Sequence, residues 1–226
     1  MNDFVFGIYP YICLAVFLLG SLVRFDRAQY TWKADSSQFL RRGQLRWGSN
    51  LFHVGILALF FGHLFGLLTP KALYEAVGLS SAAKQMLAIG AGGVFGTMCL
   101  AGLVLLVHRR LAEPRIRATS SRMDIFILLW ILATLLLGLA SIVVSLGHRD
   151  GAVMVQLGQW AQHIVTFRPG PAQFIAEGMH PLYRAHIFFG LTVFLLFPFS
   201  RLVHIWSGFA TVGYLTRAYQ IVRSRG

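Results

Sequence analysis

The chain has 226 residues, of which 56% are hydrophobic and only 12% are charged. Charged residues make up about 25% of a soluble domain, so this composition excludes an ordinary soluble protein and favours a membrane protein. The net charge is +12, but the basic residues lie between apolar stretches and not on one soluble face, which argues against a nucleic-acid-binding domain. The two cysteines, Cys13 and Cys99, both lie inside apolar stretches and do not indicate a disulfide framework.

Five apolar stretches approach the ~20 residues that a helix needs to cross a bilayer. They cover residues 4–23, 48–68, 85–107, 125–146 and 182–204. Little sequence remains between them, so the pattern predicts an all-α membrane protein in which residues 1–226 form one bundle of five transmembrane helices. The positive charges follow the first stretch and no small-residue cleavage site is evident, so we expect a retained span and not a signal peptide.

Basic residues cluster in alternate connections. One set follows the first and third stretches and continues to the end of the chain: Arg24, Arg27, Lys33, Arg41, Arg42, Arg46, Arg109, Arg110, Arg115, Arg117, Arg122, Arg201, Arg217, Arg223 and Arg225. The opposite side has fewer: Lys71, Lys84, Arg149, Arg168 and Arg184. The positive-inside rule therefore predicts an outer N-terminus and a cytoplasmic C-terminus. The basic connection 24–47 either lies on the anionic inner membrane surface or docks a cytoplasmic partner.

The second stretch contains two histidines, His53 and His63. A titratable ring inside a membrane span is costly, so it is a functional hypothesis by default. The ten-residue spacing separates the rings by ~15 Å along a helix and by ~80° around it, so both can face the bundle interior. Gly55, Gly62 and Gly66 lie close to them. These glycines either permit close helix packing or leave space for a flat macrocycle.

The third and fourth stretches carry fewer chemical candidates. Lys84 stands at the outer start of the third stretch, where an interfacial lysine is common. His108 ends the same stretch beside arginines and is expected at the interface, and Asp124 is a plausible helix cap. The remaining histidines lie in the polar outer connection 147–181 and are expected to be solvated: His148, His163 and His180.

The fifth stretch carries His186 at its outer end and His204 at its inner end. Eighteen residues make five turns, which places both rings on one helix face, ~27 Å apart. Because the second and fifth stretches run in opposite directions, His53 and His204 share the cytoplasmic level, and His63 and His186 share the outer level. The unequal spacings require tilt, oblique rings or a bend, for which Pro198 offers a position.

Two histidines on facing helices at one depth are the axial ligands of a bis-imidazole haem, which carries electrons because the iron has no vacant axial site. No C-x-x-C-H motif occurs, so the haems would be held non-covalently, as b-type. Zinc normally takes three or four clustered ligands, which pairs at two depths do not supply. The alternative is that the histidines are structural and form hydrogen bonds across helix interfaces. Two haems stacked across a membrane predict an electron path from quinol at the outer side, near Lys84 and His186, to a soluble partner inside.

Six segments closely resemble the gamma subunit of bacterial membrane-bound respiratory nitrate reductase. They are residues 8–11 (IYPY), 29–32 (QYTW), 49–53 (SNLFH), 62–70 (GHLFGLLTP), 114–119 (PRIRAT) and 195–206 (LLFPFSRLVHIW). The resemblance covers essentially the whole chain. It implies a five-span cytochrome b of the inner membrane with two b haems, the inner one on His53 and His204 and the outer one on His63 and His186.

The resemblance further implies oxidation of quinol, either menaquinol or ubiquinol, near the outer haem, with Lys84 taking part. It implies two cytoplasmic partners, an iron–sulfur beta subunit and a molybdenum-containing alpha subunit that reduces nitrate. Arg109, Arg110, Arg115 and Arg117 could pair with inner-haem propionates or with the beta subunit. Two alternatives stay open: the cytochrome b of another quinone-linked reductase, and a haem-free membrane anchor or transporter.

Overall fold

The computed structural model describes residues 1–28, 31, 40–175 and 178–207. Within these residues the fold is helical without strands, which confirms the all-α prediction. Five helices of the described chain are long and apolar enough to cross a membrane: Phe4–Ala28, Arg42–Leu68, Ser81–Ala112, Arg122–Ser145 and Pro181–Phe199. Most of the 29–32 motif, together with Lys33, Arg217, Arg223 and Arg225, lies outside the described residues.

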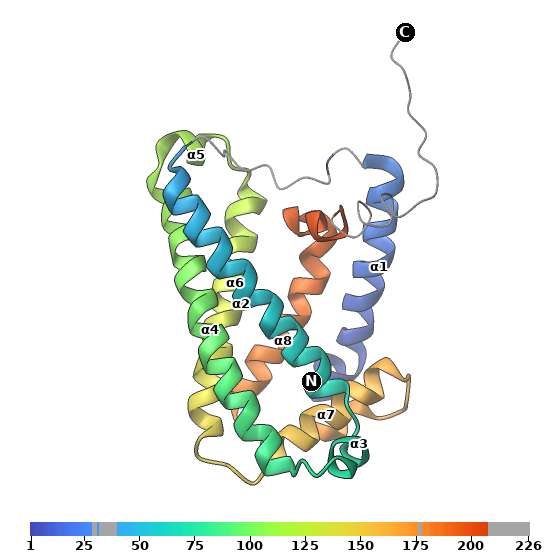
Figure 1. Cartoon of the computed structure of the whole chain (residues 1–226). Coiled ribbons are helices and arrows are strands. Elements are labelled where there is room, and N and C mark those ends of the chain that lie inside the picture. The colour runs from blue at the N-terminus through green and yellow to red at the C-terminus, as the bar shows by residue number, and fades with distance from the viewer. Residues whose placement is uncertain (29–30, 32–39, 176–177, 208–226) are drawn as a thin grey trace, which may run out of the picture.

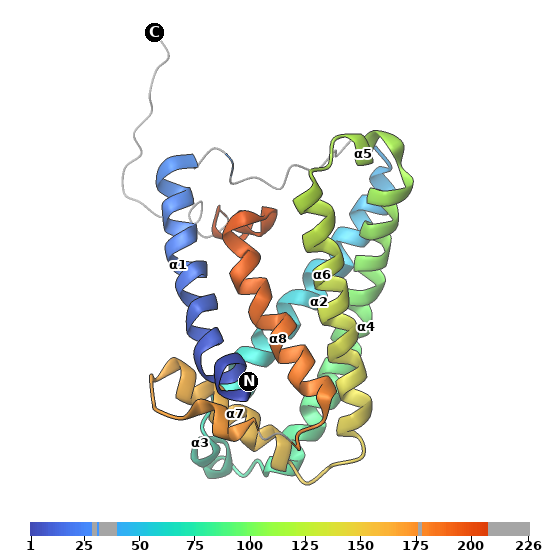
Figure 2. The same ribbon diagram turned by 180° about the vertical axis from the view of Figure 1, so that it is seen from behind.

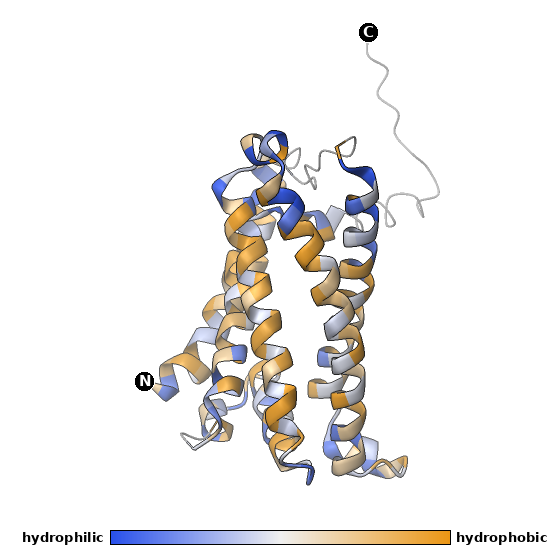
Figure 3. Cartoon of the chain, turned by 90° about the vertical axis from the view of Figure 1, so that its left-hand side faces the viewer, coloured by the Kyte–Doolittle hydropathy of each residue, from blue (hydrophilic) through white to orange (hydrophobic). Residues whose placement is uncertain are grey.

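The five long helical segments form the bundle (Figure 1). The first begins as a short π-helix, η1 (Phe4–Ile8), and continues as α1 (Tyr9–Ala28); the others are α2 (Arg42–Leu68), α4 (Ser81–Ala112), α6 (Arg122–Ser145) and α8 (Pro181–Leu196). Apolar residues cover the middle of these helices and polar residues gather near their ends (Figure 3). The α2 and α4 helices extend several residues beyond the apolar stretches that predicted them, because helical hydrogen bonding continues into the polar ends.

Helix packing follows a chain of neighbours. Direct packing joins α2 to α4, α4 to α6, α6 to α8, and α8 to α1. The α2–α4 contact is very close, because a Cβ added at Gly55 would lie 2.7 Å from the backbone nitrogen of Cys99. In Figures 1 and 2, α2 crosses the bundle obliquely, so that it reaches the region of α8 without packing along it.

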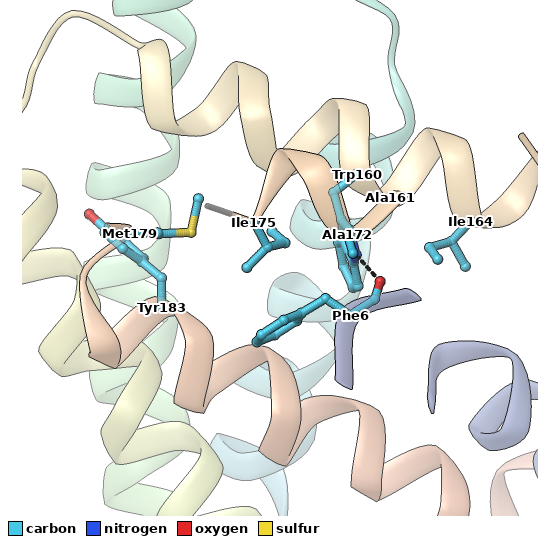
Figure 4. Close-up of a cluster of buried hydrophobic side chains, with 8 residues drawn as sticks. All are labelled: Phe6, Trp160, Ala161, Ile164, Ala172, Ile175, Met179 and Tyr183. Atoms are coloured by element: carbon cyan, nitrogen blue, oxygen red, sulfur yellow. Dashed lines mark hydrogen bonds between the residues drawn. The ribbon is translucent and has the colours of Figure 1, made fainter. Parts of the chain in front are cut away.

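The two connections at the end of the bundle that the sequence predicts to be outer form a helical layer; below, this end is called the outer end and the opposite one the inner end. For the connection 147–181, this corrects the expectation of a polar, solvated segment. Residues 69–83 contain α3 (Lys71–Ala76), and residues 147–181 contain α7 (Ala152–Val165) and the 3₁₀ turn η3 (Pro171–Phe174). The apolar faces of α7 and η3 pack on η1 and the start of α8 around a buried cluster: Phe6, Trp160, Ala161, Ile164, Ala172, Ile175, Met179 and Tyr183 (Figure 4). Trp160 Nε1–H donates to the Phe6 carbonyl at 2.9 Å. This layer closes the outer end of the bundle.

The last span is not one continuous helix to residue 204, which corrects the sequence-based prediction. The α8 helix ends at Leu196, and two 3₁₀ turns follow, η4 (Phe197–Phe199) and η5 (Arg201–Val203). Pro198 lacks an N–H group and its ring crowds the preceding turn, so the α-helix stops instead of kinking. Arg24 of α1 donates to the carbonyls of Pro198 and Ser200 at 2.7 and 2.8 Å, which holds the broken segment at the inner end.

The connection between α4 and α6 is short and structured. It contains α5 (Pro114–Ala118), and α6 begins with a capping box in which Ser121 is the N-cap and Asp124 bonds back to its backbone N–H. Asp124 is therefore the third residue of the helix and takes part in the cap that the sequence predicted, without being the N-cap residue itself.

Candidate functional site

Four histidine side chains meet in two pairs. The ring centroids of His63 and His186 are 6.0 Å apart, with the ring planes at 45°. The ring centroids of His53 and His204 are 6.3 Å apart, with the planes at 76°. The chain directions of α2 and α8 are opposite (Figure 1), so the pairs lie at two levels of the bundle. The structure therefore brings together the histidines that the sequence paired by depth.

Each of the four rings donates its Nδ1–H to a backbone carbonyl. The acceptors are Ser49 for His53, Leu59 for His63, Arg201 for His204 and Thr134 for His186, at 2.7, 2.7, 2.7 and 3.0 Å. A carbonyl only accepts, so the proton sits on Nδ1 and Nε2 keeps its lone pair. His163 makes the same kind of bond to Gln159. The tautomer is therefore shared by a helical histidine outside the pairs, and it is the facing rings that mark the candidate site.

The spacing within each pair fits one metal ion held by two imidazoles. A metal–imidazole nitrogen bond is about 2 Å long and the ring centroid lies roughly 1 Å behind the nitrogen, which places two axial rings about 6 Å apart. A porphyrin also needs room between the helices that supply the ligands. Among the described residues, α2 and α8 are not a closely packed helix pair. The residues present therefore fit two bis-imidazole haems.

No cluster of three or more His, Cys, Asp or Glu side chains that could hold a metal ion occurs within the residues that the structure describes. The arrangement thus differs from the three or four ligands of a zinc site. His204 follows the Pro181–Phe199 span in the chain. Burial lowers its pKa, which favours the neutral ring, the form that coordinates a metal.

A cavity of about 280 Å³ lies beside the outer pair. His63 and His186 line it, among small and apolar side chains of α2, α4 and α6. Its wall also includes three residues near the outer end that the sequence did not single out: Gln85, Trp160 and Tyr183. For Gln85, the sequence offered one signal, a polar residue at the start of an apolar stretch. For Trp160 it offered none, because α7 was not predicted as a helix.

Gln85 has an incomplete set of hydrogen bonds. The residue is 4% exposed, and its Nε2 donates to the carbonyls of Ser145, at 3.3 Å, and His148. Within the described part of the chain, its buried Oε1 has no hydrogen-bond partner. An unsatisfied buried acceptor costs about 1–3 kcal/mol, so a molecule that brings a donor into this part of the cavity would gain binding energy.

Glycines of α2 divide between the two interpretations that the sequence left open. Gly55 packs against Cys99 of α4, so this glycine permits close helix approach. Gly62 and Gly66 line the cavity, and a Cβ added at either would meet nothing within 4 Å. Close packing thus explains the first glycine, whereas the other two stand beside open space.

Lys84 lies at the outer start of α4 but does not line the cavity wall as its neighbour Gln85 does. Its Nζ stands 4.0 Å from the centroid of the Tyr74 ring and 3.5 Å from the Thr69 carbonyl oxygen. This is the geometry of an interfacial lysine. A role for Lys84 in quinol oxidation stays a prediction.

The four arginines at the inner end fall into two groups. Arg109 donates to the Leu40 carbonyl at 2.9 Å, and Arg110 donates to Ser120 Oγ at 2.7 Å; both residues are buried. Arg115 and Arg117 are exposed on α5. The first two therefore bind groups of this chain, and the second two are available at the surface.

The remaining histidines are not part of either pair. His148 and His180 are exposed, as expected, and His108 is exposed at the end of α4. His180 accepts a bond from the Leu182 N–H and caps α8. His163 is half-buried, with its ring centroid 4.5 Å from that of Phe174, so its expected full solvation was wrong because α7 packs on η3.

The fold and the site define a membrane-embedded helical protein with histidine pairs at two depths. The sequence matches the nitrate reductase gamma subunit family over residues 2–225. The chain belongs to that family, and is a membrane subunit of a multi-subunit respiratory nitrate reductase.

Similar proteins occur in several bacteria. The chain is 52% identical to respiratory nitrate reductase 1 gamma chain of Escherichia coli, covering 100% of this chain and 98% of that protein. It is 39% identical to nitrate reductase gamma chain of Bacillus subtilis, covering 99% of both. It is also 32% identical to nitrate reductase-like protein NarX of Mycobacterium tuberculosis, where the match covers 100% of this chain and 34% of that protein. These matches extend the family assignment over the full described bundle.

Proposed function

We propose that this chain binds two b-type haems, the inner one on His53 and His204 and the outer one on His63 and His186. The observation that carries the proposal is the presence of two facing ring pairs, 6.3 and 6.0 Å apart, at two levels of one bundle. Bound haems would supply one-electron carriers that connect the two sides of the membrane. The protein contributes the tautomer of each ligand through the carbonyl that accepts its Nδ1–H.

Quinol, either menaquinol or ubiquinol, is the proposed electron donor at the outer end. The cavity beside His63 and His186, part of which the outer haem would fill, extends to Gln85. The buried Oε1 of Gln85 would accept a hydrogen bond from a quinol hydroxyl at the edge of that haem. Lys84 supplies a positive charge one residue away, at the level where protons leave. The mostly apolar wall suits a quinone ring with an isoprenoid tail.

The proposed orientation places the N-terminus outside and the C-terminus in the cytoplasm, in a multi-pass protein of the bacterial inner membrane. The support is the concentration of basic residues at the inner end. Exposed Arg115 and Arg117 on α5 are available to the proposed partners there, an iron–sulfur beta subunit and a molybdenum-containing alpha subunit that reduces nitrate. Arg109 and Arg110 instead hold this chain's own inner end together.

Two other functions were open from the sequence. Family membership favours nitrate reductase over another quinone-linked reductase. A haem-free anchor or transporter would leave the paired rings without a shared ligand, and a purified complex lacking a Soret band would support it.

The quinol step is tested by mixing the purified complex with a reduced quinol analogue and following haem reduction. Lys84→Ala removes the positive charge of the lysine and is expected to slow quinol-driven reduction by about tenfold, which corresponds to about 1.4 kcal/mol, while dithionite still reduces both haems. Lys71→Ala is the matched control, since Lys71 is an exposed lysine of the same outer end. An unchanged rate in Lys84→Ala would remove Lys84 from the proposal.

A further inference from the structure

His186 is held differently from the other three paired histidines. His53, His63 and His204 each donate to a carbonyl three or four residues earlier in their own segment. His186 donates instead to the carbonyl of Thr134, on the neighbouring helix α6, at 3.0 Å. The orientation of this one ring therefore depends on another helix.

Gly138 lies one helical turn after Thr134 and faces the same ring. A Cβ added at Gly138 would lie 2.8 Å from Cε1, 3.3 Å from Nδ1 and 3.4 Å from Nε2 of His186. The ring cannot retreat freely, because its Nδ1–H is bound to Thr134 and its other side faces His63. Only glycine leaves enough space here for the ring to reach the carbonyl.

Two hydrogen bonds fix the spacing of α6 and α8 on either side of this contact. Trp130 Nε1–H donates to the Phe189 carbonyl at 3.1 Å. Ser145 Oγ and Tyr183 Oη share a hydrogen bond of 2.7 Å. The helices are thus tied together before and after the ring, so that crowding at Gly138 would be relieved mainly by rotation of His186.

We infer that α6 orients His186 as a ligand of the outer haem in two ways: the Thr134 carbonyl accepts its Nδ1–H, and Gly138 leaves room for its ring. This inference rests on the proposed function, and Gly138 is a positioning residue that acts through His186. The Nδ1–H bond to the carbonyl makes the imidazole a stronger electron donor, which lowers the reduction potential of the iron that it binds. The outer haem alone is sensitive to the distance between α6 and α8.

The first experiment compares Gly138→Ala with wild type in the purified complex, by redox titration and by electron paramagnetic resonance of each haem. The expected result is an upward shift in the potential of the outer haem together with altered g-values, or loss of that haem, while the inner haem is unchanged. Gly90→Ala is the control, because Gly90 is exposed on α4 and has open space around it. Unchanged outer-haem signals in Gly138→Ala would overturn the inference, whereas absence of haem from the wild type would overturn the proposed function.

The second experiment removes the ring that a methyl group added at Gly138 would crowd. His186→Gly is expected to lose the outer haem signal and regain it with added imidazole, which takes the place of the missing ring of α8 and bonds to the Thr134 carbonyl of α6. In His186→Gly/Gly138→Ala, the imidazole affinity should fall at least about fivefold, the equivalent of one lost hydrogen bond. Equal imidazole affinities in the two backgrounds would overturn the inference, even where Gly138→Ala alone does not assemble.

Discussion

The inner and outer histidine pairs share α2 but differ in how the second ring is held. At the inner pair, His204 follows the break at Pro198 and bonds to Arg201 in its own segment. Arg24 of α1 anchors that segment through backbone carbonyls. At the outer pair, His186 sits inside the regular helix α8 and bonds to α6.

This difference shows that one ligand geometry can be built in two ways. The inner ring depends on a local break in the chain and on its anchor. The outer ring depends on packing between two long helices and on the layer that closes the outer end. Changes in the shared helix should affect both sites, and changes in the separate supports should affect one.

The largest effect is expected from Gly55→Val, because α2 carries a ligand of each pair. The added side chain would meet the backbone of Cys99, 2.7 Å from the position of a Cβ, and would push α2 away from α4. Overpacking of this kind costs about 1–3 kcal/mol. Pyridine haemochrome analysis and thermal unfolding should show both haems reduced in amount and a lower unfolding temperature.

The control for that change is Gly43→Val, on the same helix, where Gly43 is exposed and a Cβ meets nothing within 4 Å. Loss of only one haem in Gly55→Val would mean that α2 does not position the two pairs together.

A smaller and one-sided effect is expected from Trp160→Phe. The change keeps an aromatic ring but removes the bond to the Phe6 carbonyl, which costs about 0.5–1.5 kcal/mol. On heating, the outer haem should be released at a lower temperature than in wild type, and the inner haem at the same temperature. Trp47→Phe, at an exposed tryptophan of the inner end, should change neither, and equal destabilisation of both haems in Trp160→Phe would contradict the expected asymmetry.

The smallest effect is expected from Ser49→Ala at the inner pair. Ser49 Oγ lies 3.2 Å from His53 Nδ1, but the Ser49 carbonyl accepts from the same atom at 2.7 Å and is retained. The stability should change by less than about 1 kcal/mol, and both haems should remain bound in redox titrations. Loss of the inner haem would show that the hydroxyl, and not the carbonyl, holds His53.

The spans and the histidine pairing could be predicted because both follow from one-dimensional rules. Apolar length gives the spans, and opposite chain directions place His63 with His186 and His53 with His204. The same rules gave unequal axial spacings of ~15 and ~27 Å. In the structure α8 ends at Leu196 and His204 follows two 3₁₀ turns, so the ~27 Å expected for one continuous helix does not apply. The position of the break at Pro198 was predicted, but its effect was expected to be a bend.

The supports of the outer pair could not be predicted in the same way. Thr134 and Gly138 lie about fifty residues from His186 in an apolar helix with no distinctive pattern, and only their packing shows their relation to the ring. Trp160 belongs to a connection whose amphipathic helix was not recognised. The polarity of Gln85 was a weak signal in the sequence. That its Oε1 is buried without a hydrogen-bond partner is known only from the structure.

The central claim is that each histidine pair holds one haem, and difference spectroscopy of single variants tests it most directly. Reduced-minus-oxidised spectra of the wild-type complex should show two low-spin b haems. His63→Ala and His186→Ala should lose the same haem, and His53→Ala and His204→Ala should lose the other. Retention of both haems in His63→Ala or His186→Ala, or loss of different haems within one pair, would contradict the account.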